Sequence, residues 1–162
     1  MNAVINGIQT NYITAGQGDP VLLLHGWGCE VKLMKPVADF LSQDMTVLTV
    51  DFPAHGKSGR PPEAFGVPEF AACLLALLRE LDFLPCSVIA HSFGGRVTIE
   101  LASADEAMFD RIILTGAAGI RPKGDGKSSK RTQTYKKLKK LVEVARKCRI
   151  FGKLPDMWQE AL

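Results

Sequence analysis

The sequence predicts an α/β fold in which a mostly parallel sheet is flanked by helices. Three observations predict it: short apolar runs bounded by turn residues, segments of helical periodicity between those runs, and a length that suits one hydrophobic core. The 162 residues are 46% hydrophobic and 23% charged, which excludes collagen, a disordered chain and a disulfide scaffold. A domain of this size buries roughly 68–70% of its unfolded surface, which is enough for a single core.

The predicted elements alternate along the chain. Residues 4–13 alternate loosely between polar and apolar side chains, and Asn6-Gly7 is typical of a hairpin turn. Continuous apolar runs predict buried strands over 21–24, 47–50, 87–90 and 111–115. Helical periodicity predicts helices over 34–42, with Pro36 in the first turn, over 68–81 and over 92–103. We therefore expect right-handed crossovers and a parallel sheet after a leading antiparallel pair.

The end of the chain differs in character from the rest. Residues 1–120 hold seven basic and thirteen acidic side chains, whereas residues 121–162 hold thirteen basic and four acidic ones. The polar, basic stretch over 121–130 predicts a linker. An apolar stripe over 135–149 predicts a helix whose remaining faces carry lysine and arginine. The sequence thus predicts two units, 1–120 and 121–162.

Targeting and metal-binding signals are weak in this sequence. The N-terminus lacks a basic start followed by an apolar core and a cleavage site, so no export signal is expected. The longest apolar run, over 70–78, is far shorter than the roughly 20 residues that span a bilayer. The four cysteines are widely spaced, without a C-x-x-C pair or a histidine cluster. We predict no metal site and a cytoplasmic location with reduced thiols.

Ser92 follows a predicted strand and precedes a predicted helix, within Ala90-His91-Ser92-Phe93-Gly94-Gly95. This context is typical of a nucleophile elbow, a sharp and strained turn that needs small neighbours. Such a turn would lift the Ser92 hydroxyl above the sheet, and the start of the helix would point N–H groups at a developing negative charge. The alternative is a serine that caps a helix, with glycines for close packing.

A second segment, His25-Gly26-Trp27-Gly28, follows the first buried strand. It predicts a loop that brings a backbone N–H beside the elbow, so that the N–H groups of Trp27 and Phe93 form an oxyanion hole. By itself the pattern also fits an ordinary turn between a strand and a helix. The later segment over 51–59 is interpreted as a structural loop.

Three segments together, H-G-W-G, D-F-P-A-H-G-K-S-G and A-H-S-F-G-G, resemble in order and spacing the N-terminal half of an alpha/beta-hydrolase. The resemblance covers residues 1 to about 120, and residues 121–162 resemble the start of the helical cap that many members insert after the sixth strand. It implies an eight-stranded core, hydrolysis of an ester, lactone or related acyl bond through an acyl-enzyme, and no cofactor. Epoxide hydrolases and haloalkane dehalogenases in this family carry Asp at the elbow, so Ser92 argues against both.

The sequence departs from the family pattern at several points. Ala90 stands at the first small position of G-x-S-x-G, and Ala54 stands where glycine is commoner, and neither change prevents the turn. The family order is serine, acid, histidine, with the last two on loops after later strands. Because those loops do not appear, we expect a core that is incomplete at its C-terminal side. Its exposed sheet edge would be open to a complementing chain or to self-association.

The candidates for a general base are the three histidines, His25, His55 and His91. His25 belongs to the oxyanion loop, where a ring that holds loop backbone is favoured. Adjacency in sequence turns His91 away from the Ser92 hydroxyl, and His55 would reach a cleft only if its loop rearranged. Since a serine hydroxyl needs an adjacent base to be nucleophilic, we expect weak turnover at best from the isolated chain.

Two other functions stay open. The fold could serve a non-catalytic ligand-binding protein, and the lysine-rich helix could bind nucleic acid or an anionic membrane. The basic segment has few aromatic residues for base stacking, Tyr135 and Trp158, and no recognised binding motif. A solvated outer face of a cap helix is favoured instead, with no nucleic acid and no membrane as partners. The predicted partner is a small ester-like molecule, and Trp27 and Phe93 suggest an apolar acyl group or ring near the nucleophile.

Overall fold

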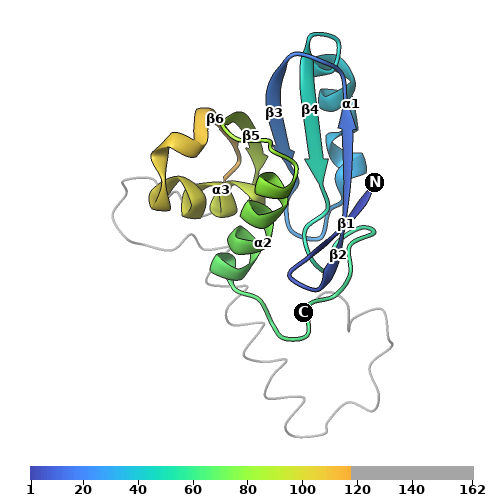
Figure 1. Ribbon diagram of the computed structural model, residues 1–162, viewed down its shortest axis with the longest axis vertical. Coiled ribbons are helices and arrows are strands. Elements are labelled where there is room, and N and C mark those ends of the chain that lie inside the picture. The colour runs from blue at the N-terminus through green and yellow to red at the C-terminus, as the bar shows by residue number, and fades with distance from the viewer. Residues whose placement is uncertain (118–162) are drawn as a thin grey trace, which may run out of the picture. The chain divides into compact units, whose positions relative to one another are not determined.

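The sheet of the computed structural model, which describes residues 1–117, has six strands in the order β1-β2-β4-β3-β5-β6 (Figure 1). The strands are β1 Asn2–Ile5, β2 Ile8–Ala15, β3 Asp19–Leu24, β4 Met45–Val50, β5 Cys86–His91 and β6 Phe109–Thr115. The first two strands pair antiparallel, and β2 pairs antiparallel with β4. From β4 to β6 all neighbours are parallel. The predicted α/β fold with a mostly parallel sheet is confirmed.

The leading hairpin turns at the predicted place. Ile5 pairs with Ile8, so only Asn6 and Gly7 form the turn. Both have positive φ, 49° and 79°, as a type I′ turn requires. Asparagine and glycine are the residues that adopt this conformation at least cost, which is why the local sequence specifies the turn.

Helices cover both faces of the sheet. They are α1 Val31–Leu41, α2 Val67–Glu80 and α3 Phe93–Ala104, and a short 3-10 helix, η1, spans Glu106–Met108. On one face, Val21, Leu23 and Val47 pack with Met34 of α1. On the other face, Leu22, Leu24 and their neighbours pack with α2 and α3. Because successive side chains of a strand point to opposite faces, both layers are needed to bury β3 and β4, which explains their continuous apolar runs.

Helix α1 corrects one prediction. It begins at Val31 rather than at residue 34, so Pro36 lies inside the helix and not in its first turn. The reason is a long-range contact: the Val31 N–H donates to the carboxylate of Asp51 at 2.7 Å. Pro36 has no N–H to donate, so α1 lacks one internal hydrogen bond. A helix start that depends on a residue 20 positions away leaves little trace in the local sequence.

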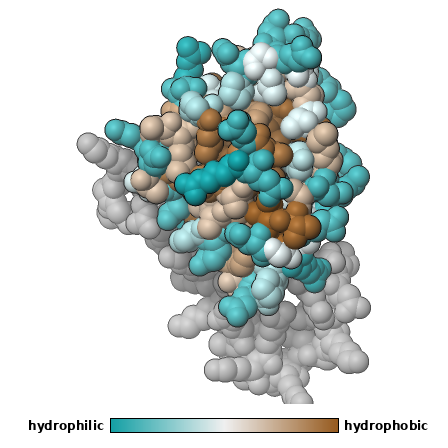
Figure 2. All heavy atoms as spheres, in the orientation of Figure 1, coloured by the Kyte–Doolittle hydropathy of each residue, from teal (hydrophilic) through white to brown (hydrophobic). Residues whose placement is uncertain are grey.

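Strand β6 is the edge strand of the described sheet on the side of β5, and most of its residues are exposed. Ile112 and Ile113 are 43% and 52% exposed. Figure 2 shows apolar side chains reaching the surface between polar ones on the face in view. Within residues 1–117, no helix has the length and hydrophobicity to cross a bilayer. The predicted unit over 121–162, with its linker and basic helix, lies outside the described residues, and the division of the chain stays a prediction.

Candidate active site

Ser92 occupies a sharp turn between β5 and α3. Its φ is 48° and its ψ is −107°, a region that residues other than glycine rarely adopt. The Ser92 N–H donates to the Thr115 carbonyl of β6 at 3.0 Å, and the Ser92 carbonyl accepts the Gly95 N–H at 3.1 Å. The strained conformation is therefore held from both sides by backbone hydrogen bonds.

The two glycines after Ser92 are required by close packing. A Cβ atom on Gly94 would lie 2.7 Å from the Leu24 Cβ and 2.9 Å from the His25 carbonyl oxygen. A Cβ atom on Gly95 would lie 2.8 Å from the Cβ of Ala117. Helix α3 thus approaches the ends of β3 and β6 more closely than any side chain would allow.

The hydroxyl of Ser92 does not cap α3. Ser92 stands at the N-cap position, but its side chain makes no capping hydrogen bond. A simple N-cap serine would accept an N–H from the first turn of its helix and would have extended backbone rather than positive φ. The alternative of an ordinary helix cap therefore lacks its defining hydrogen bond.

The loop over residues 25–30 lies against this turn. The Cys29 N–H donates to the Gly26 carbonyl at 3.2 Å, and Gly28 has a φ of 71°, which is typical of the third residue of a type II turn. A Cβ atom on Gly26 would be 3.3 Å from the Ser92 Cβ and 3.2 Å from the His91 ring. Glycine at position 26 therefore allows the loop backbone to approach the elbow.

Several N–H groups of these neighbouring segments have no acceptor among the described residues. They include those of Trp27 and Gly28 in the loop and those of Phe93, the first residue of α3, and Gly94. The side chains of Trp27 and Phe93 meet edge to face, with ring centroids 5.1 Å apart. The first turn of a helix leaves its N–H groups unpaired and favours negative charge. The arrangement can therefore bind an anionic oxygen.

His25 holds the backbone of its own loop. The fully buried ring donates from Nδ1 to the Gly26 carbonyl at 2.8 Å and accepts the Phe52 N–H at Nε2 at 3.3 Å. Burial lowers the pKa of His25 below its ordinary value of 6.5, against the opposing effect of the hydrogen bond to Gly26. Both ring nitrogens are engaged in a neutral ring, so His25 has no nitrogen left to accept a proton from Ser92.

The other two histidines are also tied to backbone. His91 donates from Nδ1 to the Thr115 carbonyl at 3.0 Å, toward β6. His55 donates from Nδ1 to the Pro53 carbonyl at 2.9 Å, and its ring packs edge to face against Trp27 with centroids 4.9 Å apart. Position 55 is 8% exposed, and its loop is braced by Ala54 and Gly56, which have positive φ.

Sequence reasoning missed Asp51. Its side chain is fully buried next to the loop over 25–30 and accepts three hydrogen bonds, although the segment over 51–59 is predicted only as a structural loop. A signal exists in hindsight: an acidic residue directly follows a buried strand, where the chain turns. A carboxylate at such a position needs several donors, and those come from distant segments that the sequence does not reveal.

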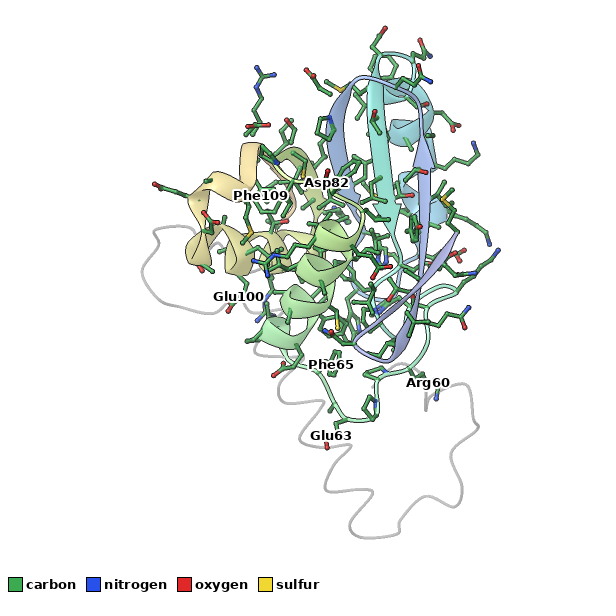
Figure 3. The ribbon with its side chains drawn as sticks, in the orientation of Figure 1. Arg60, Glu63, Phe65, Asp82, Glu100 and Phe109 are labelled. Carbon is green, nitrogen blue, oxygen red and sulfur yellow. The ribbon has the colours of Figure 1, made fainter. Side chains whose placement is uncertain are left out.

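Aromatic side chains form one wall beside Trp27. Phe93 and Phe70 pack with centroids 5.1 Å apart, and Trp27 lies against both. Phe65, which is labelled in Figure 3 ahead of α2, extends the wall at 5.6 Å from Phe70. Trp27 itself is 64% exposed. A large indole held by ring contacts and still open to solvent offers an apolar surface for a ligand.

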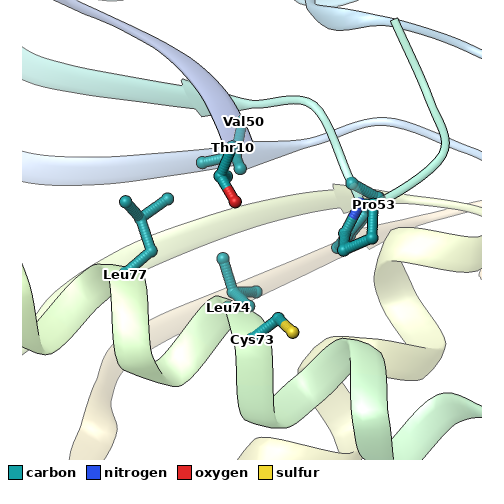
Figure 4. Close-up of a pocket in the computed structure, with 7 residues that line it drawn as sticks. Thr10, Val50, Pro53, Cys73, Leu74 and Leu77 are labelled. Atoms are coloured by element: carbon teal, nitrogen blue, oxygen red, sulfur yellow. The ribbon is translucent and has the colours of Figure 1, made fainter. Parts of the chain in front are cut away.

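A separate small pocket lies between α2 and the sheet (Figure 4). Its lining is mostly apolar and includes Cys73, whose pKa is raised by burial. The space suits about one water molecule, so it does not compete with Ser92 as a substrate site. Within the described part of the chain, no group of three His, Cys, Asp or Glu side chains is placed to hold a metal ion.

Comparison with known proteins gives a consistent result. The sequence profile of the Alpha/beta hydrolase family matches residues 21–159. The chain is 32% identical over 124 residues to a soluble epoxide hydrolase of Corynebacterium sp. (strain C12), covering 76% of this chain and 43% of that protein. It is 31% identical over 118 residues to a 2-hydroxy-6-oxo-2,4-heptadienoate hydrolase of Pseudomonas putida, covering 70% and 43%.

The fold has solved counterparts. An alpha/beta hydrolase fold protein from Burkholderia ambifaria superposes with a TM-score of 0.75 and 22% identity, covering 99% of this chain and 55% of that one. The chain spans only 28 to 43% of the length of the curated relatives it matches.

Proposed function

The chain belongs to the alpha/beta hydrolase family, and we propose that it is a serine hydrolase in which Ser92 attacks an ester-like carbonyl to form an acyl-enzyme. The observation that carries the proposal is the pair of N–H groups on Trp27 and Phe93, which have no acceptor in residues 1–117 and belong to the two segments that meet at the strained Ser92. Preorganised donors of this kind stabilise the negative charge that develops in acyl transfer.

The proposed reaction has four steps. The Ser92 oxygen forms a bond to the carbonyl carbon, and its proton passes to a general base. The carbonyl oxygen becomes an oxyanion held by the N–H groups of Trp27 and Phe93. The bond to the leaving group breaks as the proton is returned to that group, which leaves the acyl-enzyme. Water then attacks the acyl group with the same base, and the acid product and free Ser92 are released.

The general base and its acidic partner are proposed to come from polypeptide other than these 162 residues. All three histidines of the sequence lie in described segments, and each donates from Nδ1 to a backbone carbonyl. In the family pattern the acid and the histidine follow the nucleophile on loops after later strands. A complementing chain or a longer protein would supply them beside β6, most of whose residues are exposed.

The proposed substrate is a small molecule with an apolar group or ring near its reacting carbonyl. The aromatic wall of Trp27, Phe70 and Phe93 supports this, because it offers ring faces and edges next to Ser92. The name of the Pseudomonas relative describes a hydrolase of an unsaturated oxo acid. The epoxide hydrolase relative is a weaker guide to the chemistry of this chain. Epoxide hydrolases of this family carry Asp at the elbow, whereas this chain has Ser92.

Labelling with a fluorophosphonate tests the nucleophile. The serine oxygen displaces fluoride from phosphorus only when it is activated. We therefore expect labelling of the full protein, meaning this chain together with the polypeptide that supplies its base, and no labelling of its Ser92→Ala variant. Mass spectrometry of the digested protein would locate the adduct. Labelling that persists in Ser92→Ala, or a wild-type protein that is never labelled, contradicts the serine mechanism and favours a ligand-binding role.

Two variants at one position test the oxyanion hole. Trp27→Pro removes the N–H, and proline is common at the second residue of a type II turn, so the turn is expected to persist. Trp27→Ala keeps the N–H and removes the indole. Loss of one donor lowers kcat by about 100- to 1,000-fold in comparable sites, so we expect this loss for Trp27→Pro only. Equal kcat values in the two variants would contradict the assignment of the Trp27 N–H to the oxyanion hole.

A further inference from the structure

One buried carboxylate joins three segments behind the oxyanion loop. Asp51 directly follows β4, and its side chain is fully buried. Its Oδ1 atom accepts the Val31 N–H at 2.7 Å. Its Oδ2 atom accepts Nδ2 of Asn11 at 2.8 Å and the Lys57 N–H at 2.9 Å. The donors belong to α1, to β2 and to the loop over 51–59, so a single side chain fixes all three.

Among residues 1–117, the Asp51 carboxyl group is hydrogen-bonded by N–H donors and has no cationic partner. In residues 1–117 the nearest basic group is Nε2 of His25, at 3.9 Å from Oδ1, and this ring is kept neutral because burial lowers its pKa. Burying a carboxylate costs several kcal/mol, and well-packed apolar residues often stabilise a core as well or better. Core packing alone therefore gives little reason for a buried carboxyl group at this place.

One end of the oxyanion loop is bonded to Asp51, and the other end is held beside it. The loop over 25–30 connects β3 to α1 and carries Trp27 in its middle. At the far end, Asp51 binds the first N–H of α1 directly. At the near end, the His25 ring lies beside Asp51 and joins the Gly26 carbonyl to the N–H of Phe52, the residue after Asp51.

We propose that Asp51 is a positioning residue, which holds the Trp27 N–H where it meets the oxyanion above Ser92. The inference rests on the proposed function, since it assigns the loop its catalytic purpose. Asp51 touches no substrate and acts through the N–H of Val31, at the end of the loop. A displacement of about 1 Å in a reacting site costs about 100-fold in rate. Loss of the carboxylate is therefore expected to lower kcat and to leave KM unchanged.

Two variants break the link at different points. Asp51→Asn replaces one acceptor oxygen with an amide that faces other donors. Val31→Pro removes the N–H that Asp51 accepts, at the first residue of α1, where proline is well tolerated. Glu30 has a φ of −141° and a ψ of 170°, which is the extended conformation required before proline. Val31→Pro is thus expected to fold with α1 intact.

Ser58→Ala is the matched control. The Ser58 hydroxyl accepts the Asn11 N–H at 2.9 Å and donates to the backbone carbonyl of Asp51 at 2.7 Å. It is half-buried next to the same network, and its hydrogen bonds go to Asn11 and Asp51 rather than to the loop over 25–30. A role of Asp51 in stability alone would make the three variants alike once each is measured while folded.

The experiment measures the rate at which a fluorophosphonate labels the full protein. The maximal rate constant and the half-saturating reagent concentration are determined separately. Circular dichroism checks that each variant is folded. We expect Asp51→Asn and Val31→Pro to lower the maximal rate constant by about 10- to 100-fold, with half-saturation and the Ser58→Ala values within about threefold of wild type. Val31→Pro decides the matter alone if Asp51→Asn does not fold.

The outcomes separate the two proposals. If wild type is labelled at Ser92 and Val31→Pro reacts at the rate of Ser58→Ala, Asp51 has no positioning role and the serine mechanism stands. If wild type shows no labelling that depends on Ser92, the proposed function fails and the positioning role fails with it.

Discussion

The two segments that meet at Ser92 are held in place by different forces. The elbow is fixed by close contact, since Gly94 and Gly95 leave no room for a side chain against Leu24 and Ala117. The oxyanion loop is fixed by a buried polar network around Asp51. A close-packed contact is destabilised when a substitution adds volume. A buried polar network is destabilised when one partner is displaced and leaves the others without a hydrogen bond. Substitutions should therefore affect the two segments in different ways.

The largest expected effect is at Gly56, under the Asp51 carboxylate. A Cβ atom on Gly56 would overlap the Asp51 carboxylate oxygens, and its φ is 51°. Gly56→Ala therefore adds backbone strain and displaces a buried charge from its donors. We expect the free energy of unfolding to fall by about 3 kcal/mol or more, as measured by urea denaturation.

Gly28→Ala is the matched comparison for Gly56→Ala. Gly28 also has positive φ, 71°, but a Cβ atom there would meet nothing within 4 Å. Backbone strain alone predicts a loss of about 1–2 kcal/mol. If the two variants lose the same free energy, the Asp51 network does not carry the stability of this region.

The neutral His25 ring should make stability depend on pH. Its pKa is lowered in the folded protein from 6.5, so the unfolded chain binds more protons below that pH. The free energy of unfolding should then fall as pH decreases below about 6.5, by at most about 1.4 kcal/mol per pH unit. His25→Asn should lack this component. A wild-type and variant difference that is constant between pH 7.5 and 5.5 would contradict it.

At the elbow a substitution by glycine should raise the free energy of unfolding relative to a substitution by alanine. Ser92 has a φ of 48°, and this strain is relieved by glycine but not by alanine. We expect Ser92→Gly to unfold with a free energy about 1 kcal/mol higher than Ser92→Ala, while neither variant is labelled by a fluorophosphonate. Equal stability of the two variants would mean that the elbow stores no strain.

The difference between the two segments also explains what the sequence could predict. The elbow is local, because its strand, serine and glycines are consecutive, and the hairpin at Asn6-Gly7 is local in the same way. The start of α1 and the buried role of Asp51 depend on contacts between residues 20 to 40 positions apart. Periodicity and turn signals describe neighbours along the chain, so such contacts leave no pattern for them to find.

The smallest effect on stability is expected at the exposed side chains of β6. The elbow is bonded to the backbone of this strand and not to those side chains. The Thr115 carbonyl binds the Ser92 N–H, whereas the Ile113 side chain is 52% exposed. Lysine on an edge strand opposes pairing with another chain, so Ile113→Lys should reduce self-association measured by sedimentation. Its free energy of unfolding should stay within about 0.5 kcal/mol of wild type. Leu114→Lys is the contrasting variant, because Leu114 packs against the core beside Gly95, and it should unfold much more easily. A large loss of stability in Ile113→Lys would show that the elbow depends on the side chains of β6 as well as on its backbone.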